Sequence, residues 1–365
     1  MSVDWAAVRA QFPALAGWTY LNTATFGQLP QCAVEATLRH YQRRDELACY
    51  DFLSWFDDAD QVRALAARLI NAAPADIAFI PNASSALSIL LNGIDWKPGD
   101  RIVTLENEFP NNLYAPTLTR NRGVECIEAT WDTFYESINA RTRLVAVSTV
   151  NYTNGFRLPA EEVAAFLRER GVLLYLDGTQ SVGALRFDVA KVQPDMLAVH
   201  GYKWLLSPNG AGFVYVAPAL RRTLPPAVAG WRSDKRWRQV DYLHHGSPEF
   251  VESAEKYEGG MLAFPCIYAM GASLRLFLEL GPQLIEERVL SLAAQMKDVL
   301  ESKGGRVVHT GSQTLAARFE GRDASAIARE LYDRRILAAA RHGNLRVSVH
   351  LYNNEEDLEN LRRAL

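Results

Sequence analysis

The stretch from Gly171 to Val216, GVLLYLDGTQSVGALRFDVAKVQPDMLAVHGYKWLLSPNGAGFVYV, decides the fold of this chain. It contains three short apolar runs, at Val172–Leu176, Met196–Val199 and Gly212–Val216. Continuous apolar runs of this length are typical of strands that are covered on both faces, as in a parallel sheet flanked by helices. The stretch therefore predicts three strands of an α/β sheet.

An acid and a lysine follow two of these runs. Asp177 comes directly after the first run, and Lys203 lies in the segment that follows the second. Ligands of open α/β sheets bind just beyond the carboxyl ends of the strands, where both residues would lie. Pyridoxal phosphate (PLP) needs such a pair, because a lysine holds it as a Schiff base and a carboxylate keeps its ring nitrogen protonated. The two residues therefore predict a PLP site.

Several motifs resemble one known family. D-G-T-Q at 177–180 and H-G-Y-K at 200–203 are followed by a glycine-bearing turn at Asn209–Gly212. In this order they resemble the motifs of the class V aminotransferases, which include cysteine desulfurases, kynureninases and isopenicillin-N-epimerase-like enzymes. The resemblance runs from about Tyr20 to the C-terminus, and it implies PLP as the cofactor.

The resemblance also implies a fold. It is the α/β type I fold of PLP-dependent transferases, with a large domain built on a mostly parallel sheet of the seven-stranded type and a smaller α+β C-terminal domain. Alternation of strands and helices from Ile77 to Val216 likewise predicts a mostly parallel sheet with right-handed crossovers. We expect residues 15–255 to form the large PLP-binding domain, and residues 1–14 with 256–365 to form the small domain.

Two helical segments precede the first strand of this alternation. Asp4–Gln11 has the pattern of a short amphipathic helix, and we expect it to pack with the C-terminal small domain. Cys32–Ala73 predicts one long helical segment, because apolar residues recur at helical spacing and Pro74 marks its end.

The turn after the predicted strand Ile77–Ile80 is a candidate phosphate site. It is made of small residues and opens an apolar helix, Ala86–Leu91. Such a turn presents free backbone N–H groups and the positive end of the helix dipole to an anion. We expect Ala83 and Ser84 to bind the cofactor phosphate; the alternative for Ser84 is an ordinary helix N-cap.

The resemblance assigns four further residues to the cofactor. Phe109 would stack on the pyridine ring, with a core phenylalanine beside a helix-starting proline as the alternative. Gln180 would donate a hydrogen bond to the phenolic oxygen of the ring. His200 and Tyr202 occupy positions where the family binds the phosphate.

Lys203 and Asp177 are the predicted catalytic residues. Lys203 would hold the cofactor and then move the α-proton of the substrate, which requires a lowered lysine pKa. Asp177 would pair with the ring nitrogen, so that the ring can take up electrons released at the α-carbon. A buried and otherwise unpaired aspartate would be costly at this place, which favours the functional interpretation.

Two residues are predicted to bind substrate. Arg346 matches the family arginine that grips the α-carboxylate, and a guanidinium does this with two parallel hydrogen bonds. The alternative is a surface arginine on a strand. Asn22 lies in a segment that passes the mouth of the site in the family, with a polar turn residue as the alternative.

The sequence departs from the family pattern at two places. Met261 stands where family members place a threonine that contacts the cofactor phosphate of the neighbouring subunit. The segment Ile336–Asn344, ILAAARHGN, is short and has no cysteine, whereas cysteine desulfurases carry their nucleophilic cysteine shortly before the arginine. Desulfurase chemistry by that route is therefore not expected.

Composition excludes several classes of protein. The 365 residues carry a net charge of −3, which argues against a general nucleic-acid-binding protein. The chain has no stretch of about 18 uninterrupted apolar residues, so we expect no membrane span. The N-terminus lacks a basic-then-apolar secretory pattern. We expect a cytoplasmic protein.

The cysteines and histidines predict no metal site. The four cysteines, Cys32, Cys49, Cys126 and Cys266, are widely spaced without a C-x-x-C motif, so we expect reduced structural thiols. The pair His244-His245 has no metal-ligand partner at a suitable spacing.

Together these observations predict a PLP-dependent aminotransferase that acts on an amino acid and a keto acid through a Lys203 Schiff base. The alternatives are an amino-acid epimerase, a kynureninase-like C–C or C–S lyase, and a PLP-binding homologue without turnover. The resemblance also implies a homodimer, because active sites of the family lie at subunit interfaces.

Overall fold

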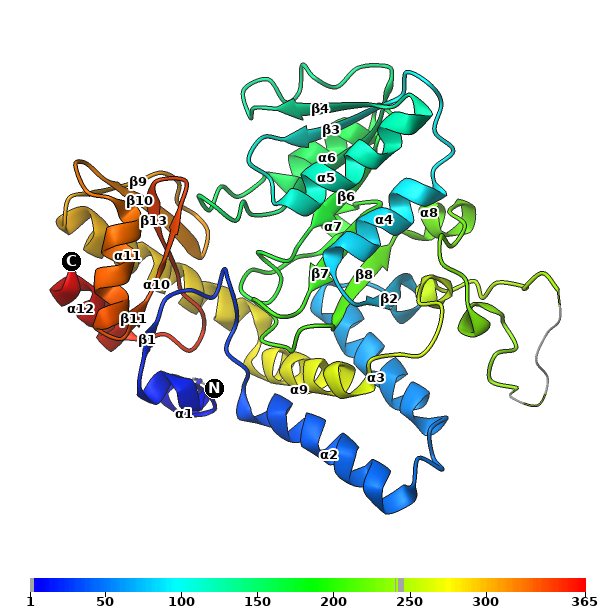
Figure 1. Cartoon of the computed structure of the whole chain (residues 1–365), viewed down its shortest axis with the longest axis horizontal. Helices are drawn as coiled ribbons and strands as arrows, with labels where there is room; N and C mark the ends of the chain where they lie inside the picture. The colour runs from blue at the N-terminus through cyan, green and yellow to red at the C-terminus, as the bar shows by residue number, and fades with distance from the viewer. Residues whose placement is uncertain (1–2, 240, 242–245) are drawn as a thin grey trace.

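The computed structural model describes residues 3–239, 241 and 246–365, so His244-His245 lies outside the described residues. Two separate sheets organise the chain, and Figure 1 shows the C-terminal sheet with helices α10 to α12 gathered on one side of the large sheet. The strands of the large sheet are β2 (Ile77–Ile80), β3 (Arg101–Leu105), β4 (Glu125–Ala129), β5 (Thr142–Ser148), β6 (Leu173–Asp177), β7 (Met196–His200) and β8 (Gly212–Val216).

The large sheet has seven strands in the order β2-β8-β7-β6-β5-β3-β4. β3 to β7 are parallel to one another, whereas β8 is antiparallel to both β7 and β2. The prediction of an α/β fold with a mostly parallel seven-stranded sheet is confirmed. The three strands predicted from the central stretch lie within one residue of their expected bounds.

Both faces of the large sheet are buried, which explains the continuous apolar runs. Leu174 and Leu176 face one core together with residues of α3 (Ser54–Leu69), α6 (Ala160–Arg168) and α9 (Phe264–Leu280). Tyr175, between them, faces a second core with α4 (Ala83–Gly93) and α8 (Pro218–Thr223). Alternate residues of each strand thus serve opposite cores, and the carboxyl ends of the strands remain available for a site.

The prediction of one helical segment from Cys32 to Ala73 is wrong. The structure has two helices there, α2 (Gln31–Leu47) and α3, joined by a turn. Ala48 and Cys49 have φ angles of 49° and 61°, in the left-handed region, and this conformation ends α2. The apolar spacing continues through the turn, so periodicity alone did not reveal the break.

The second sheet is antiparallel, with strand order β12-β13-β10-β9. Its strands are β9 (Gly305–Val307), β10 (Thr314–Phe319), β12 (Ala339–Arg341) and β13 (Asn344–Ser348). It shares a core with helices α10 (Pro282–Ser302), α11 (Ala324–Asp333) and α12 (Glu355–Ala364). The segment Ile336–Asn344, which has no cysteine, contains β11 (Ile336–Leu337) and β12; β11 pairs in parallel with β1 (Thr19–Tyr20).

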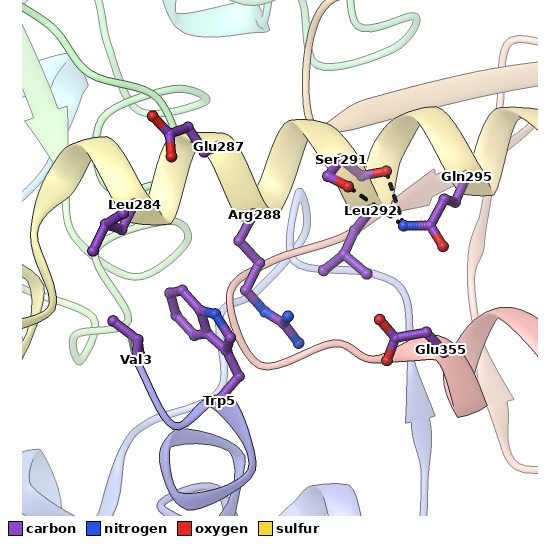
Figure 2. A pocket seen from close by; sticks show the side chains of 9 residues that line it. All are labelled: Val3, Trp5, Leu284, Glu287, Arg288, Ser291, Leu292, Gln295 and Glu355. Atoms are coloured by element: carbon purple, nitrogen blue, oxygen red, sulfur yellow. Dashed lines mark hydrogen bonds between the residues drawn. The ribbon is translucent and has the colours of Figure 1, made fainter. Parts of the chain in front are cut away.

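The N-terminal helix α1 (Trp5–Ala10) packs against this C-terminal part, as predicted. Asp4 caps it by accepting hydrogen bonds from two N–H groups of the first turn. In Figure 2, Trp5 and Arg288 of α10 point toward each other, and the guanidinium carbon lies 4.7 Å from the indole ring centre. Arg288 also donates hydrogen bonds to the carbonyls of Leu351 and Asn353, at 2.9 and 2.5 Å.

The division into a large domain of residues 15–255 and a small domain of residues 1–14 with 256–365 stays a prediction. Near that boundary, α9 packs closely on α2 and α3. Within the described part of the chain, no helix has both the length and the apolar character needed to cross a membrane.

Candidate active site

The candidate site lies at the carboxyl ends of β5, β6 and β7, where Ser148, Asp177 and His200 end their strands. The pocket there is lined by Ala83, Phe109, Asn111, Ser148, Tyr152, Asp177, Thr179, Gln180, His200, Tyr202 and Lys203. The fold therefore brings together every predicted cofactor residue except Ser84, which follows Ala83 in α4.

Lys203 is a buried amine without a polar partner. Lys203 is 5% exposed, and its Nζ lies 5.1 Å from the ring centres of both Phe109 and Tyr202. Among the described residues, none forms a hydrogen bond or an ion pair with Nζ. Burial, together with the charge of Arg346, lowers the pKa of Lys203 to about 8, while the charge of Asp177 acts in the opposite direction. This is the direction that a lysine base needs.

Asp177 is a buried carboxylate that lines the pocket and is held by Thr179. Its Oδ1 accepts the backbone N–H of Thr179 at 2.9 Å, and the side chain of Thr179 is a further hydrogen-bond partner of the carboxylate. Burial raises the pKa of Asp177, although Thr179 and the charge of Lys203 act in the opposite direction. A protonated ring nitrogen would add a charged donor to this buried carboxylate, so the aspartate fits the pyridine end of PLP.

The opposite end of the site fits a phosphate. Helix α4 begins at Ala83, so the N–H groups of Ala83 and Ser84 lie in its first turn, which has no intrahelical acceptors. The N-cap is Asn82, whose Oδ1 accepts the N–H of Ser85 at 3.0 Å, so the alternative role of Ser84 as the cap is wrong.

His200 adds an unsatisfied polar atom to the pocket. Its Nε2 is buried and has no hydrogen-bond partner. Burial, followed by the charge of Lys203, lowers the pKa of His200 to about 4, so the imidazole is neutral at pH 7. The ring of Tyr202 lies 4.4 Å from that of His200. A buried nitrogen without a partner is the kind of group that a bound cofactor satisfies.

Gln180 is held rigidly but keeps one free donor. Its side-chain oxygen accepts the indole N–H of Trp204 at 2.8 Å, and its amide nitrogen donates to the carbonyl of Ala24 at 3.0 Å. An amide group has two N–H donors, so one remains for a ligand oxygen. The arrangement is compatible with the predicted contact to the phenolic oxygen of PLP.

Sequence reasoning missed Glu108, which is 3% exposed and lies beneath the pocket. Its carboxylate accepts the N–H and the hydroxyl of Ser148, at 2.7 and 2.5 Å, and the amide of Asn112 at 3.0 Å. Ser148 pairs with Asp177 across β5 and β6. Burial raises the pKa of Glu108 to about 7. The only sequence signal is a glutamate directly before Phe109, and its partners are distant in the chain.

Arg346 and Asn22 lie together. Arg346 is 1% exposed, so the alternative of a surface arginine is wrong. Its guanidinium donates to the carbonyl of Tyr152 at 2.6 Å, to Thr25 Oγ1 at 2.6 Å and to Asn22 Oδ1 at 3.2 Å. Asn22 therefore orients the arginine, and the pocket connects to Arg346 through Tyr152. Burial, then repulsion from Arg341, lowers the pKa of Arg346 to about 10.

The remaining predictions concern Met261 and metals. Met261 is 63% exposed in the single chain. Across residues 3–239, 241 and 246–365, no cluster of three or more histidine, cysteine, aspartate or glutamate side chains is placed to hold a metal ion.

The sequence of this chain is similar to those of known PLP-fold proteins over nearly its whole length. A family model described as Aminotransferase class-V matches residues 19–361. The isopenicillin N epimerase of Streptomyces clavuligerus is 28% identical, over 99% of this chain and 98% of that protein. A probable cysteine desulfurase of Methanothermobacter thermautotrophicus is 24% identical, over 98% of this chain and 96% of that protein.

Solved structures share the fold. A complex of the cystine C–S lyase C-DES with its reaction product, cysteine persulfide, has a TM-score of 0.89 at 24% identity and covers 97% of this chain and 98% of that one. The apo structure of a cysteine desulfurase from Thermococcus onnurineus has a TM-score of 0.88 at 21% identity, over 100% of this chain and 97% of that one.

Proposed function

The chain belongs to the class V aminotransferase family of PLP-dependent enzymes, and from this premise we propose that it acts on an amino acid as an aminotransferase. The observation that carries the proposal is the buried, unpartnered amine of Lys203, with a pKa near 8, in one pocket with Asp177. A surface lysine or a structural aspartate would have neither this burial nor this shared pocket.

Each residue of the pocket has a role in this proposal. PLP, when bound, supplies a ring that stabilises negative charge at the substrate α-carbon. Asp177 holds the proton on the ring nitrogen, and Ala83, Ser84 and His200 bind the phosphate. Lys203 anchors the cofactor covalently and, once released by the substrate amine, removes the α-proton.

The remaining groups position the reactants. Phe109 offers an apolar ring face for stacking beside Lys203, and Gln180 offers one N–H to the phenolic oxygen. Arg346 binds the α-carboxylate of the substrate, and Asn22 and Thr25 orient its guanidinium. The guanidinium of Arg346 and the free N–H groups of Ala83 and Ser84 thus suit the carboxylate of an amino-acid substrate and the phosphate of the cofactor.

The number of general bases in the pocket favours transamination. A single base suffices for transamination, because one amine moves a proton from the α-carbon to the cofactor. Lys203 is the one amine that lines the pocket among the described residues, and Asp177 and His200 are engaged with the cofactor in this proposal.

An epimerase is the second candidate. Its support is the 28% identity with an isopenicillin N epimerase over nearly the whole of both chains. Epimerisation requires a second proton donor on the other face of the α-carbon, and the hydroxyls of Tyr152 and Tyr202 are the available groups in the pocket.

Desulfurase chemistry is less well supported, although several relatives carry that name. The hairpin formed by β12 and β13 contains no cysteine. The four thiols, Cys32, Cys49, Cys126 and Cys266, are free, and none of them lines the pocket.

A single-turnover experiment tests the proposal. The PLP-loaded protein is mixed with an excess of each amino acid in the absence of an acceptor. An aminotransferase releases one keto acid per active site and no ammonia, because the amino group stays on the cofactor. An epimerase inverts the substrate and exchanges its α-proton with deuterated water without forming keto acid. A lyase releases ammonia together with keto acid over many turnovers. Absence of a visible cofactor band and of any of these products would contradict enzymatic function.

The pKa of Lys203 predicts a pH profile for cofactor loading. The neutral amine is the form that reacts with an aldehyde, and its fraction rises with pH until the pKa is passed. With a pKa lowered from 10.5 to about 8, the rate at which apoprotein gains the visible band after mixing with PLP should climb up to about pH 8 and then level off. Stopped-flow absorbance measures it; a rate that still climbs through about pH 10 would indicate an unperturbed lysine.

We further propose that the active form is a homodimer. Helix α2 exposes Val34, Leu38 and Tyr41 by 43%, 55% and 48%, at spacings of four and three residues that place them on one face. An exposed apolar row of this kind favours contact with another protein surface. Sedimentation equilibrium should yield twice the chain mass of 40.8 kDa, whereas a fully active monomer would refute the dimer.

A further inference from the structure

A tight hairpin places a second arginine beside Arg346. β12 and β13 are antiparallel and are joined by His342 and Gly343, whose φ angles of 49° and 76° are both left-handed, as a type I′ turn requires. Ala339 is directly opposite Arg346, and Arg341 is two residues further along β12. Side chains two residues apart on a strand share a face, so Arg341 and Arg346 are diagonal neighbours on one face of the sheet.

The tip of this hairpin lies next to Tyr152, which lines the candidate site. The ring of His342 lies 6.4 Å from that of Tyr152, and the ring of Tyr152 lies 5.2 Å from that of Phe109, in edge-to-face contacts. Phe109 in turn lies 5.1 Å from Lys203 Nζ. A continuous row of rings therefore connects the hairpin tip to the reactive amine.

The charges on this side of the site are unbalanced. Arg341 donates one hydrogen bond, to the carbonyl of Ala340 at 2.7 Å, and no acidic side chain of the described residues pairs with Arg341 or Arg346. After burial, which is the largest influence on both, repulsion from Arg341 lowers the pKa values of Lys203 and Arg346. The substrate α-carboxylate balances Arg346 in the proposed function, which leaves Arg341 without a counter-charge.

Arg341 is half-buried, so water compensates its positive charge only in part, and a bound anion would compensate the rest. The two-residue turn fixes the backbone of Arg341 beside β13, which places its side chain near Arg346 before a ligand binds.

We propose, building on the function proposed above, that the substrate is an amino acid whose side chain carries a carboxylate, and that Arg341 binds this distal carboxylate. Arg346 and Arg341 then hold the two ends of one dicarboxylic molecule. Arg341 is a specificity-determining residue, which selects acidic over neutral side chains of the same length.

Equilibrium binding of ligands that cannot react tests the proposal. Isothermal titration calorimetry compares glutarate with butyrate, which lacks the second carboxylate, on the PLP-loaded protein. We expect glutarate to bind about 10- to 100-fold more tightly, as charge-assisted hydrogen bonds to a carboxylate allow. Arg341→Gln should reduce this preference to within about twofold and leave butyrate binding unchanged.

Matched variants separate the role of Arg341 from general effects. Arg341→Lys retains the charge and should keep part of the preference for glutarate. Arg318→Gln removes an exposed arginine from the neighbouring strand β10 and should keep all of it. Arg346→Gln should weaken glutarate and butyrate alike, because both would lose the shared carboxylate contact.

The outcomes distinguish this inference from the proposed function. Equal binding of glutarate and butyrate, or an unchanged preference in Arg341→Gln, overturns the role of Arg341 even if the cofactor band and turnover are present. Preference for glutarate that depends on Arg341, without any turnover of amino acids, supports the acidic-ligand site and overturns the aminotransferase proposal.

Discussion

Replacing Lys203 with alanine is expected to lower turnover of amino acids by at least about 10³-fold, since a positioned general base alone contributes about 10²- to 10⁴-fold. The same change removes the covalent anchor, so the visible band of the bound cofactor should be lost or shifted. Because Lys203 is buried and has no polar partner among the described residues, the change breaks no hydrogen bond or ion pair of the chain. The protein should therefore fold, and its circular dichroism should be unchanged.

The control for this prediction is Lys191→Ala, which removes an exposed lysine from α7 (Val189–Val192). It should retain both turnover and the cofactor band. A primary amine such as methylamine, added to Lys203→Ala, should restore part of the turnover by replacing the lost base. Turnover within about tenfold of the unaltered protein in Lys203→Ala would contradict the assignment of the base.

Replacing Glu258 with glutamine is expected to lower the free energy of unfolding by about 3 to 5 kcal/mol, because it removes the fully buried anion that two buried arginines share. Glu258 is fully buried and contacts Arg63 at 2.5 Å, Arg232 at 2.7 Å and the N–H of Phe79 at 2.8 Å. Burial alone would raise the pKa of Glu258, but the two arginines outweigh it and the pKa lies below its usual value. Asp60 still pairs with Arg63 and Glu255 with Arg232, but neither carboxylate bridges both arginines as Glu258 does.

This network ties α3 and β2 to the segment that leads to Met261. Urea unfolding followed by tryptophan fluorescence measures its contribution. The matched control is Glu301→Gln, which removes an exposed ion pair with Lys297 on α10 and should unfold at nearly the same urea concentration. If Glu258→Gln unfolded together with this control, the buried network would have no stabilising role.

Much of the fold could be predicted because it depends on local pattern. The strand Ile77–Ile80 and the strand Gly212–Val216 have the predicted bounds, since each is an apolar run that ends at a turn. The break of the helical segment at Ala48 and Cys49 was missed, because two residues in the left-handed region interrupt a helix without interrupting its apolar spacing. β12 was missed because three residues are too few to show a period.

The candidate site divides in the same way. Residues that follow strands of a parallel sheet, such as Asp177 and Lys203, are brought to one edge by the topology, so their shared pocket follows from their positions in the sequence. Glu108 could not be assigned, because its partner Ser148 becomes its neighbour only when β3 and β5 pair. Arg346 was predicted from its motif, but its burial and its contact with Asn22 depend on the packing of β13 against the N-terminal segment.

The sequence by itself determined the α/β class and the cofactor, and it predicted the lysine and the aspartate proposed to serve that cofactor, because these depend on short apolar runs and on the residues that end them. Only the tertiary structure decided how the groups act on one another. Burial sets the pKa of Lys203, and the hairpin at His342 and Gly343 brings Arg341 beside Arg346. Desolvation and charge repulsion act through space, so their effects depend on distances that the order of residues does not contain.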